Sequence, residues 1–290
     1  MIQIAIVSGK GGTGKTTLAG SLTFLFENHV VADCDADAPN LYLLLDLKDK
    51  ESFEFSGGKK ASISLDKCTK CGICKDVCRF DAVIYDGDYK IDPYACEGCS
   101  ACVIACPEKA ITLVKTKDGE YYRAFMDSMP VVHGRLNPGE DASGGLAAEI
   151  RKLAIKEGER LKKRVVLIDG APGIGCPAIS SITGATYIVI ITEPTTSGLH
   201  DLTRIVKVIQ QLKRRFGVVI NKADLNTEVS ERIERYCRDE NFKILGRIPF
   251  DETVELAVRQ GKPVIHFQDS EASKAIMTIY MKLKRILGIK

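Results

Sequence analysis

A chain of 290 residues with 45% hydrophobic and 27% charged residues has the composition of a globular protein that can bury a sizeable core. Its formal net charge of +3 is too small to favour nucleic acid as a partner. No apolar run reaches the roughly 18 residues of a membrane span, and the first residues lack the pattern of a signal peptide. We therefore expect a cytoplasmic protein.

The chain begins with a strand–helix–strand pattern. Residues 3–8 form an apolar strand candidate, residues 9–17 read "GKGGTGKTT", a helix is expected over 15–28, and a second strand over 29–34. The same alternation returns after residue 165, with strands expected at 165–168, 185–192, 216–220 and 242–248, and helices at 198–213, 227–239 and 251–260. Continuous apolar strands alternating with helices predict an α/β fold with a mostly parallel sheet covered by helices on both faces.

A cysteine-rich stretch, residues 61–117, interrupts this pattern. "KCTKCGICKDVCRFDAVIYD" aligns with "ACEGCSACVIACPEKAITLV" 28 residues later, cysteine on cysteine. We therefore expect an inserted α+β module at 61–117, within a host domain formed by 1–60 and 118–290. Two further strands are expected at 120–126 and 129–136, then a turn region at 137–145 and a helix at 146–161.

The glycine loop matches the P-loop pattern, because Gly9-x-x-x-x-Gly14-Lys15-Thr16 follows a strand and opens a helix. Its N–H groups would hold phosphates, Lys15 would contact the β and γ phosphates, and the Thr16 hydroxyl would bind Mg²⁺. The predicted nucleotide-binding residues of the loop are Gly11, Gly12, Thr13, Gly14, Lys15, Thr16 and Thr17. The dinucleotide fingerprint is the alternative, but it has no use for Lys15 and Thr16.

The early lysine of "KGGTGKT", Lys10, resembles the signature of the deviant Walker A loop in the MinD/ParA family of P-loop ATPases, which includes the nitrogenase iron protein. The resemblance implies a homodimer formed on ATP binding, in which Lys10 reaches the nucleotide of the partner subunit. A positive charge delivered in this way would stabilise the phosphoryl group in transfer. A solvent-exposed loop lysine is the alternative.

The resemblance extends to two acidic segments. "VVADCDADAPNL" is similar to the family's switch I, which implies that Asp35 orients the attacking water and contributes to the Mg²⁺ site, with Asp33 and Asp37 as supports or turn acids. "VVLIDGAPGIG" is similar to the Walker B and switch II segment, which implies that Asp169 binds Mg²⁺. Lys10, Lys15 and Asp35 are the predicted catalytic residues.

Base recognition is implied by two further segments. "VVINKADLN" places Asn221, and "GRIPFDE" places Pro249, where the family contacts the base. Asn-Lys-x-Asp also resembles the guanine-reading motif of GTPases. Within the MinD-like group the asparagine contacts adenine, so the resemblance favours ATP and leaves GTP open.

The eight cysteines of the insert have the C-x2-C-x2-C-x3-C spacing twice, as in bacterial two-cluster ferredoxins. In that pattern the fourth cysteine of each run binds the other cluster. One 4Fe–4S cluster would then use Cys68, Cys71, Cys74 and Cys106, and the other Cys78, Cys96, Cys99 and Cys102. Arg79 replaces the first expected proline, and zinc is the competing metal.

Two weaker signals remain. Cys176, seven residues after Asp169, is either part of a third metal or sulfur site or a small buried residue at a helix start. The C-terminal "KAIMTIYMKLKRILGIK" is either a core helix or, less favoured, a membrane-binding amphipathic helix.

Taken together, the motifs resemble MinD-superfamily ATPases with an inserted two-cluster ferredoxin domain. The resemblance implies an ATP-hydrolysing dimer that couples nucleotide state to electron transfer toward an unidentified redox or metallocofactor protein. The alternative is an ATP-dependent carrier of iron–sulfur clusters or of a metal cofactor. A positioning ATPase on a membrane or nucleoid is a third hypothesis, which the modest charge does not favour.

Overall fold

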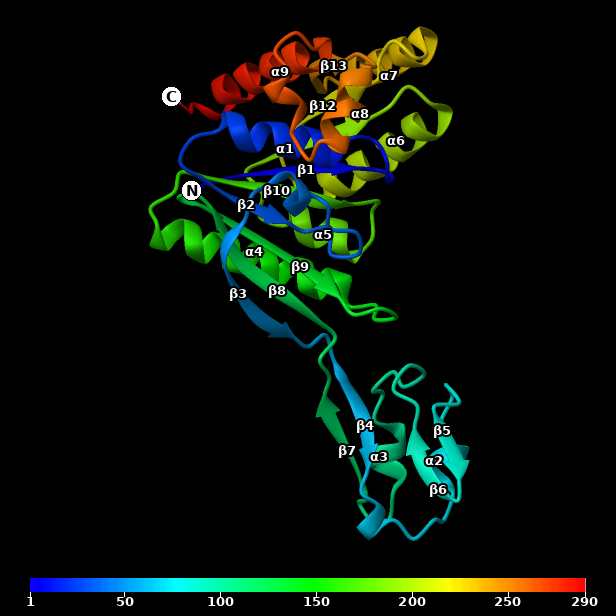
Figure 1. The fold of residues 1–290 in the computed structure, drawn as a ribbon. Helices are drawn as coiled ribbons and strands as arrows, with labels where there is room; N and C mark the ends of the chain where they lie inside the picture. Colours follow the sequence, from blue (N-terminus) through cyan, green and yellow to red (C-terminus); the bar gives the residue numbers. More distant parts are fainter. Residues whose placement is uncertain (290) are drawn as a thin grey trace. The chain divides into compact units, whose positions relative to one another are not determined.

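The computed structural model describes residues 1–289 and divides the chain into two compact units (Figure 1). The first unit consists of Met1–Phe53, Tyr121–Arg135 and the chain from Ser143 onward. The second consists of Glu54–Glu120 and Leu136–Ala142.

Within residues 1–289 one nine-stranded sheet has the order β13-β12-β11-β1-β10-β2-β9-β8-β3. Its strands are β1 (Ile2–Ser8), β2 (His29–Asp33), β3 (Lys48–Phe55), β8 (Gly119–Met126), β9 (Met129–Leu136), β10 (Val165–Pro172), β11 (Tyr187–Thr192), β12 (Phe216–Asn221) and β13 (Lys243–Ile248). Every neighbouring pair from β13 to β9 is parallel. The carboxyl ends of these strands therefore meet at one edge, and the expected mostly parallel α/β sheet is confirmed.

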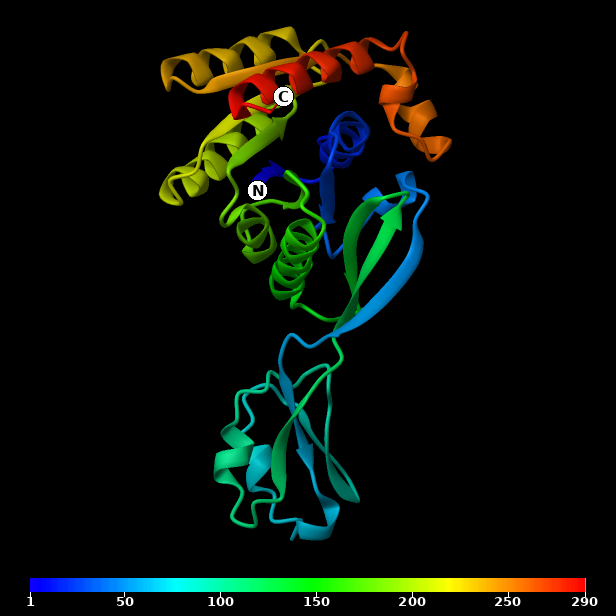
Figure 2. The ribbon, with the colours of Figure 1, turned by 90° about the vertical axis from the view of Figure 1, so that its left-hand side faces the viewer.

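Helices cover both faces of this sheet (Figure 1). α1 (Lys15–Leu25) and α9 (Glu271–Leu287) lie on one face, and α4 (Ser143–Arg160) and α5 (Cys176–Ile182) lie on the other, as the view turned by 90° in Figure 2 also shows. The remaining helical elements of this unit are η1 (Leu41–Leu44), α6 (Thr196–Gln211), α7 (Thr227–Asp239), α8 (Glu252–Arg259) and η3 (Val264–His266).

The C-terminal helix α9 is a core element. Ile276, Ile279 and Leu283 are almost completely buried in the apolar cluster that includes Leu18 and Leu22 of α1. The apolar stripe of α9 is thus covered by the sheet and by α1, as expected for a packed helix. Among the helices of the described residues, none has the length and apolar character needed to cross a bilayer.

The second unit carries the cysteine repeat as two copies of one strand–helix–strand pattern. β4 (Lys59–Ile63), α2 (Ile73–Asp76) and β5 (Val83–Asp86) recur as β6 (Asp88–Ile91), α3 (Ala101–Ala105) and β7 (Ile111–Lys115), with the short turn η2 (Leu65–Lys67) in the first copy only. β4 pairs antiparallel with β7, and β5 pairs antiparallel with β6. Because each pair takes one strand from each copy, the two copies form a single small core.

This unit is wider than the expected insert of residues 61–117. The Asp118 carboxylate accepts a hydrogen bond from the Gly57 N–H, and the Asn137 side chain donates to the Lys117 carbonyl. Lys60 forms an ion pair of 3.0 Å with Glu140. These contacts join residues 54–60 and 136–142 to the cysteine-bearing segment, and the sequence pattern could not reveal them because the partners are far apart in the chain.

Candidate nucleotide site and cysteine cavities

The glycine loop connects β1 to α1 in a conformation that requires glycine. Gly12 and Gly14 have φ angles of 74° and 93°, in the left-handed region that side chains avoid. A Cβ atom on Gly14 would also lie 2.4 Å from Nδ2 of Asn221. The loop buries Thr13 and Lys15 and leaves Gly11 and Gly12 exposed, with Gly14, Thr16 and Thr17 half-buried.

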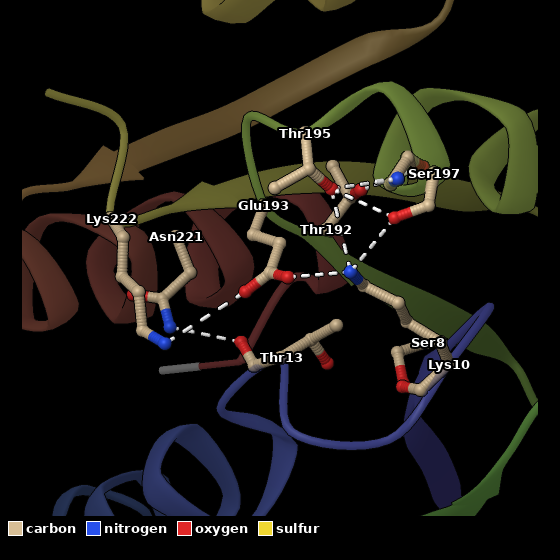
Figure 3. Close-up of polar contacts among 10 residues, drawn as sticks. Ser8, Lys10, Thr13, Thr192, Glu193, Thr195, Ser197, Asn221 and Lys222 are labelled. Carbon is tan, nitrogen blue, oxygen red and sulfur yellow. Dashed lines mark hydrogen bonds and ion pairs between the residues drawn. The ribbon is translucent and has the colours of Figure 1, made fainter. Parts of the chain in front are cut away.

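Asn221 lies at the end of β12 and binds the loop directly. Its Nδ2 donates a hydrogen bond of 2.9 Å to the Thr13 carbonyl (Figure 3). The residue expected to read the base therefore also holds the phosphate loop, which the sequence motif did not indicate. Pro249 follows β13 at the same carboxyl edge and is half-buried. Contact of either residue with a base stays a prediction.

Asp169 is a buried carboxylate at the centre of this edge. It lies in register with Ile6 of β1 and Asp33 of β2. Burial raises the pKa of Asp169 to about 7, although the neighbouring Thr16 hydroxyl and the charge of Lys15 oppose the rise. Neither oxygen makes a well-formed hydrogen bond with any residue that the structure describes. A buried carboxylate without a full set of donors, beside a threonine hydroxyl, fits an Mg²⁺ site because Mg²⁺ prefers oxygen ligands.

The three acids after β2 have different surroundings. Asp33 is fully buried, and its two carboxylate oxygens accept hydrogen bonds from the N–H groups of Asp35 (3.2 Å) and Leu41 (3.1 Å). Asp35 is half-buried, and burial raises its pKa while Lys15 lowers it. Asp37 is exposed. Asp33 therefore supports the turn, and Asp35 is the acid of this turn that interacts with Lys15.

Lys10 is bound inside its own subunit (Figure 3). Its ammonium lies 2.6 Å from Glu193 Oε1 and donates hydrogen bonds to Ser197 (3.1 Å) and Thr195 (3.4 Å). Lys222 Nζ lies 3.8 Å from the other carboxylate oxygen of Glu193. Sequence reasoning missed Glu193, although its position directly after β11, at the carboxyl edge of the sheet, is a signal that could have found it.

The eight cysteines of the second unit line two cavities. One cavity is bordered by Cys68, Cys71, Cys74 and Cys106, and the other by Cys78, Cys96, Cys99 and Cys102. The structure thus groups the cysteines in the two crossed sets that the ferredoxin pattern implies, with the fourth cysteine of each run on the other cavity. Four thiols around one cavity fit the thiolate donor set of a 4Fe–4S cluster.

The two cysteine loops share one backbone conformation despite different residues. Left-handed φ angles occur at Lys70 and Gly98, at Gly72 and Ser100, and at Asp81 and Lys109, each pair at equivalent positions of the repeat. Arg79 lies in the same kind of turn as Pro107, so the missing proline changes nothing in the local fold. In both copies the second cysteine is exposed and the third is buried.

Backbone N–H groups also point at two of the sulfurs. The Ala61 N–H donates to Cys96 Sγ (3.4 Å), and the Ala110 N–H donates to Cys106 Sγ (3.3 Å). Each cavity therefore has one such hydrogen bond. Bonds of this kind stabilise negative charge on a thiolate ligand.

Cys176 begins α5 and is exposed, so its interpretation as a small buried residue is wrong. Cys176 packs against Gly144 of α4. A Cβ atom added to Gly144 would lie 2.8 Å from the Cβ of Cys176. The helix start was placed correctly, but Cys176 reaches solvent because the side chain precedes the first buried turn of α5. Over residues 1–289, no group of three or more His, Cys, Asp or Glu side chains is close enough to hold a single metal ion.

Comparisons with known proteins agree with the fold. The CobQ/CobB/MinD/ParA nucleotide binding domain matches residues 4–264. The septum site-determining protein MinD of Pyrococcus horikoshii, solved with Mg-ADP, superimposes with a TM-score of 0.58 at 19% identity, over 99% of this chain and 98% of its own. At this identity the likeness concerns the fold alone.

Relatives in sequence are found at several levels of identity. An uncharacterized protein of Methanocaldococcus jannaschii is 37% identical over 290 residues, 99% of this chain and 98% of its own. A protein of Pyrococcus horikoshii named iron-sulfur cluster carrier protein is 22% identical over 97% of this chain and 85% of its own. One component of the Na(+)-translocating ferredoxin:NAD(+) oxidoreductase complex of Acetobacterium woodii is 43% identical over 67 residues, 22% of this chain and 20% of its own. The matched region, the glycine loop and the parallel sheet together show that the chain belongs to the CobQ/CobB/MinD/ParA family of nucleotide-binding P-loop proteins.

Proposed function

We propose that this protein is an ATP-hydrolysing iron–sulfur protein of the cytoplasm, which dimerises on ATP binding and couples its nucleotide state to electron transfer through two 4Fe–4S clusters. One observation carries the proposal: a single chain combines a glycine loop that buries Lys15, beside an acid suited to Mg²⁺, with two cavities, each lined by four cysteines. The relative named as a component of a ferredoxin:NAD(+) oxidoreductase complex supports the redox part. The acceptor would be a redox or metallocofactor protein.

In the nucleotide site, the N–H groups of Gly11, Gly12, Thr13 and Gly14 and the ammonium of Lys15 would hold the phosphates, with Thr17 at the start of α1 beside them. Thr16, Asp35 and Asp169 would hold Mg²⁺, which supplies charge neutralisation at the phosphates. Asp35 would orient the attacking water. Asn221 and Pro249 would contact the base, and Lys10 would reach the nucleotide of the partner subunit.

In the second unit the two cysteine sets would each bind one cluster, which supplies a one-electron redox centre. The N–H groups of Ala61 and Ala110 would stabilise the added negative charge of the reduced state through the sulfurs of Cys96 and Cys106. Eight cysteines in two complete sets leave each cluster fully coordinated. Full coordination suits electron transfer better than substrate chemistry on the cluster.

An ATP-dependent cluster carrier is the second candidate. The relative named iron-sulfur cluster carrier protein favours it, and so does the exposure of Cys71 and Cys99, one thiol of each set. A carrier must present its cluster to an acceptor, and an exposed ligand is where exchange would begin.

An EPR redox titration distinguishes the two. Anaerobically reconstituted protein would be titrated once with Mg–ADP and once with a Mg–ATP analogue. Electron transfer coupled to nucleotide predicts a shift of about 30 mV or more in either cluster potential, which is about 0.7 kcal/mol for one electron. The same titration of Lys15→Ala, which should not bind the nucleotide, is the control. Unchanged potentials, with clusters passing to an apo-ferredoxin when ATP is added, would favour the carrier.

A further inference from the structure

We propose that Glu193 is a positioning residue that holds Lys10 within its own subunit until ATP is bound, and that Lys222 pairs with Glu193 when Lys10 leaves. The proposal rests on the proposed function for the destination of Lys10, the nucleotide of the partner subunit. The hold itself rests on contacts within one subunit (Figure 3).

The Lys10 ammonium is fully engaged in hydrogen bonds and an ion pair. An ammonium has three N–H donors, and three acceptors surround this one: Glu193 at 2.6 Å, Ser197 at 3.1 Å and Thr195 at 3.4 Å. The side chains of Lys10 and Glu193 are only 30% and 16% exposed. Lys10 must therefore give up these bonds before it can donate to a phosphate of another subunit.

The acceptors around Lys10 are fixed in place. Thr195 is the N-cap of α6 and accepts a hydrogen bond from the Gly198 N–H. The hydroxyl of Thr192, at the end of β11, donates to the Gly198 carbonyl. The start of α6 is thus tied to β11 at the residue that precedes Glu193, so the site that receives Lys10 exists before any ligand binds.

Lys222 is close enough to Glu193 to replace Lys10 as the partner of its carboxylate. Lys222 Nζ lies 3.8 Å from Glu193 Oε2, against 2.6 Å from Lys10 to Oε1. If Lys10 left alone, a mostly buried carboxylate would lose its partner, which is costly. A small movement of Lys222 offsets that cost, so the two lysines compete for one carboxylate.

Lys222 is connected to the phosphate loop through its neighbour in the chain. Lys222 directly follows Asn221, whose side chain binds the Thr13 carbonyl of the loop. The Lys222 backbone has a left-handed φ of 51°, an uncommon conformation for a lysine. A nucleotide bound in the loop would therefore affect the backbone that sets the direction of the Lys222 side chain. ATP binding would shift the balance toward the Lys222–Glu193 pair.

The competition predicts opposite effects for two substitutions. Glu193→Gln weakens the hold on Lys10 and should lower the concentration of Mg–ATP analogue needed for half-maximal dimerisation by about 2- to 5-fold, the range of a single partly exposed ion pair. Lys222→Met removes the competitor and should raise that concentration by a similar factor. The double variant should behave like Glu193→Gln, because without the carboxylate Lys222 has no effect.

The experiment uses the reconstituted full chain and two readouts. Sedimentation velocity measures dimer formation against analogue concentration. Acylation of Lys10 by an amine-reactive ester, followed by mass spectrometry without nucleotide, measures the hold in the monomer, with exposed Lys207 as internal reference. Glu193→Gln should raise the Lys10 labelling rate severalfold, and Glu255→Gln, the same change in an exposed ion pair of α8, should leave it unchanged.

Each outcome separates the two proposals. Equal rates of Lys10 labelling in the wild-type protein and in folded Glu193→Gln would overturn the inference. So would a change in the same direction, for Glu193→Gln and Lys222→Met, of the analogue concentration that gives half-maximal dimerisation. Faster labelling in Glu193→Gln without analogue-dependent dimerisation of the wild type would overturn the proposed dimer and leave the hold in place. Thermal unfolding of each variant verifies that it is folded.

Discussion

At the scale of single residues, neighbouring acids with the same chemistry have different roles because their contacts differ. Asp33 is buried and accepts two backbone hydrogen bonds, so its carboxylate holds the turn. Asp35 is half-buried near Lys15, and Asp37 is exposed. The alternation of acids in "DCDAD" predicts a functional segment, but only the surroundings separate the support from the candidate catalyst.

Asp35→Asn should separate hydrolysis from binding. We expect phosphate release to fall by about 10²- to 10⁴-fold, the usual contribution of a positioned acid–base group. Affinity for an ATP analogue should fall far less than the hydrolysis rate, since the loop that holds the phosphates is unchanged and Asp35 is one of three proposed Mg²⁺ ligands. Steady-state phosphate release and equilibrium binding of the analogue measure the two effects. Asp37→Asn is the matched control, and an equal loss of hydrolysis in both variants would contradict the role of Asp35.

At the scale of elements, the cysteine repeat shows how one backbone is specified by two different sequences. Lys70 takes the left-handed position that Gly98 takes in the second copy, and Ser100 takes the position of Gly72. Non-glycine residues in this conformation carry some strain. The repeated spacing of cysteines predicts the ligand sets, and the paired φ angles explain why both copies form the same loop.

If the two crossed cysteine sets each hold one of the proposed clusters, they predict which cysteines act together. Cys106→Ser should remove about four of about eight iron atoms per chain and should change the same EPR signal as Cys68→Ser. Cys78→Ser should instead change the signal affected by Cys96→Ser. Iron analysis and EPR of anaerobically reconstituted variants measure both effects. Cys176→Ser is the control, and loss of iron from that variant would indicate a third site there.

Helix α9 gives a prediction on stability. Leu283→Ala should lower the free energy of unfolding by about 2–5 kcal/mol, because Leu283 is fully buried against the sheet and α1. Met281→Ala, on the exposed side of the same helix, should change it by less than about 0.5 kcal/mol. Urea unfolding of the full chain, monitored by circular dichroism, measures the change in the free energy of unfolding for both variants. Equal small effects would place the apolar face of α9 outside the core.

At the scale of the whole molecule, two buried histidines make stability depend on pH. Burial, with a smaller effect of Lys163, lowers the pKa of His29 to about 4 from 6.5. Burial, with Lys50 and Arg135, lowers that of His133 to about 4. In the folded protein both rings stay neutral at a pH where the unfolded chain binds protons. Their contribution to stability is therefore complete above about pH 6.5 and is lost as the pH is lowered toward 4, whereas the raised pKa of Asp169 acts in the opposite direction.

Between pH 7.5 and 5.5 the free energy of unfolding should fall by about 1 kcal/mol for each buried histidine. His29→Gln should remove its share of this slope, whatever its effect on absolute stability. Denaturant unfolding at several pH values measures the slope. His200→Gln, at an exposed position, should leave the slope unchanged, and an identical slope in the wild-type protein and in His29→Gln would show that the His29 ring is not held neutral.

Most of the fold was predictable because its signals are local. Continuous apolar runs marked β1, β2 and the strands after residue 165, and the helix over Thr227–Asp239 was placed at its observed ends. Strand β3 was not predicted, since "KDKESFEF" is charged and largely exposed. Its place beside β8 depends on pairing with a segment on the far side of the cysteine repeat in the chain, which no local pattern encodes.

The sequence by itself determined the P-loop, the acids at the strand ends and the two crossed cysteine sets, because each depends on fixed spacing along a short stretch of chain. Only the tertiary structure decided that Asp33 supports the turn, that Asn221 binds the loop, and that Glu193 pairs with both Lys10 and Lys222. The physical reason is the parallel sheet. It brings the carboxyl ends of strands that are distant in sequence to one edge, and the contacts made there depend on side chains whose spacing in the chain carries no signal.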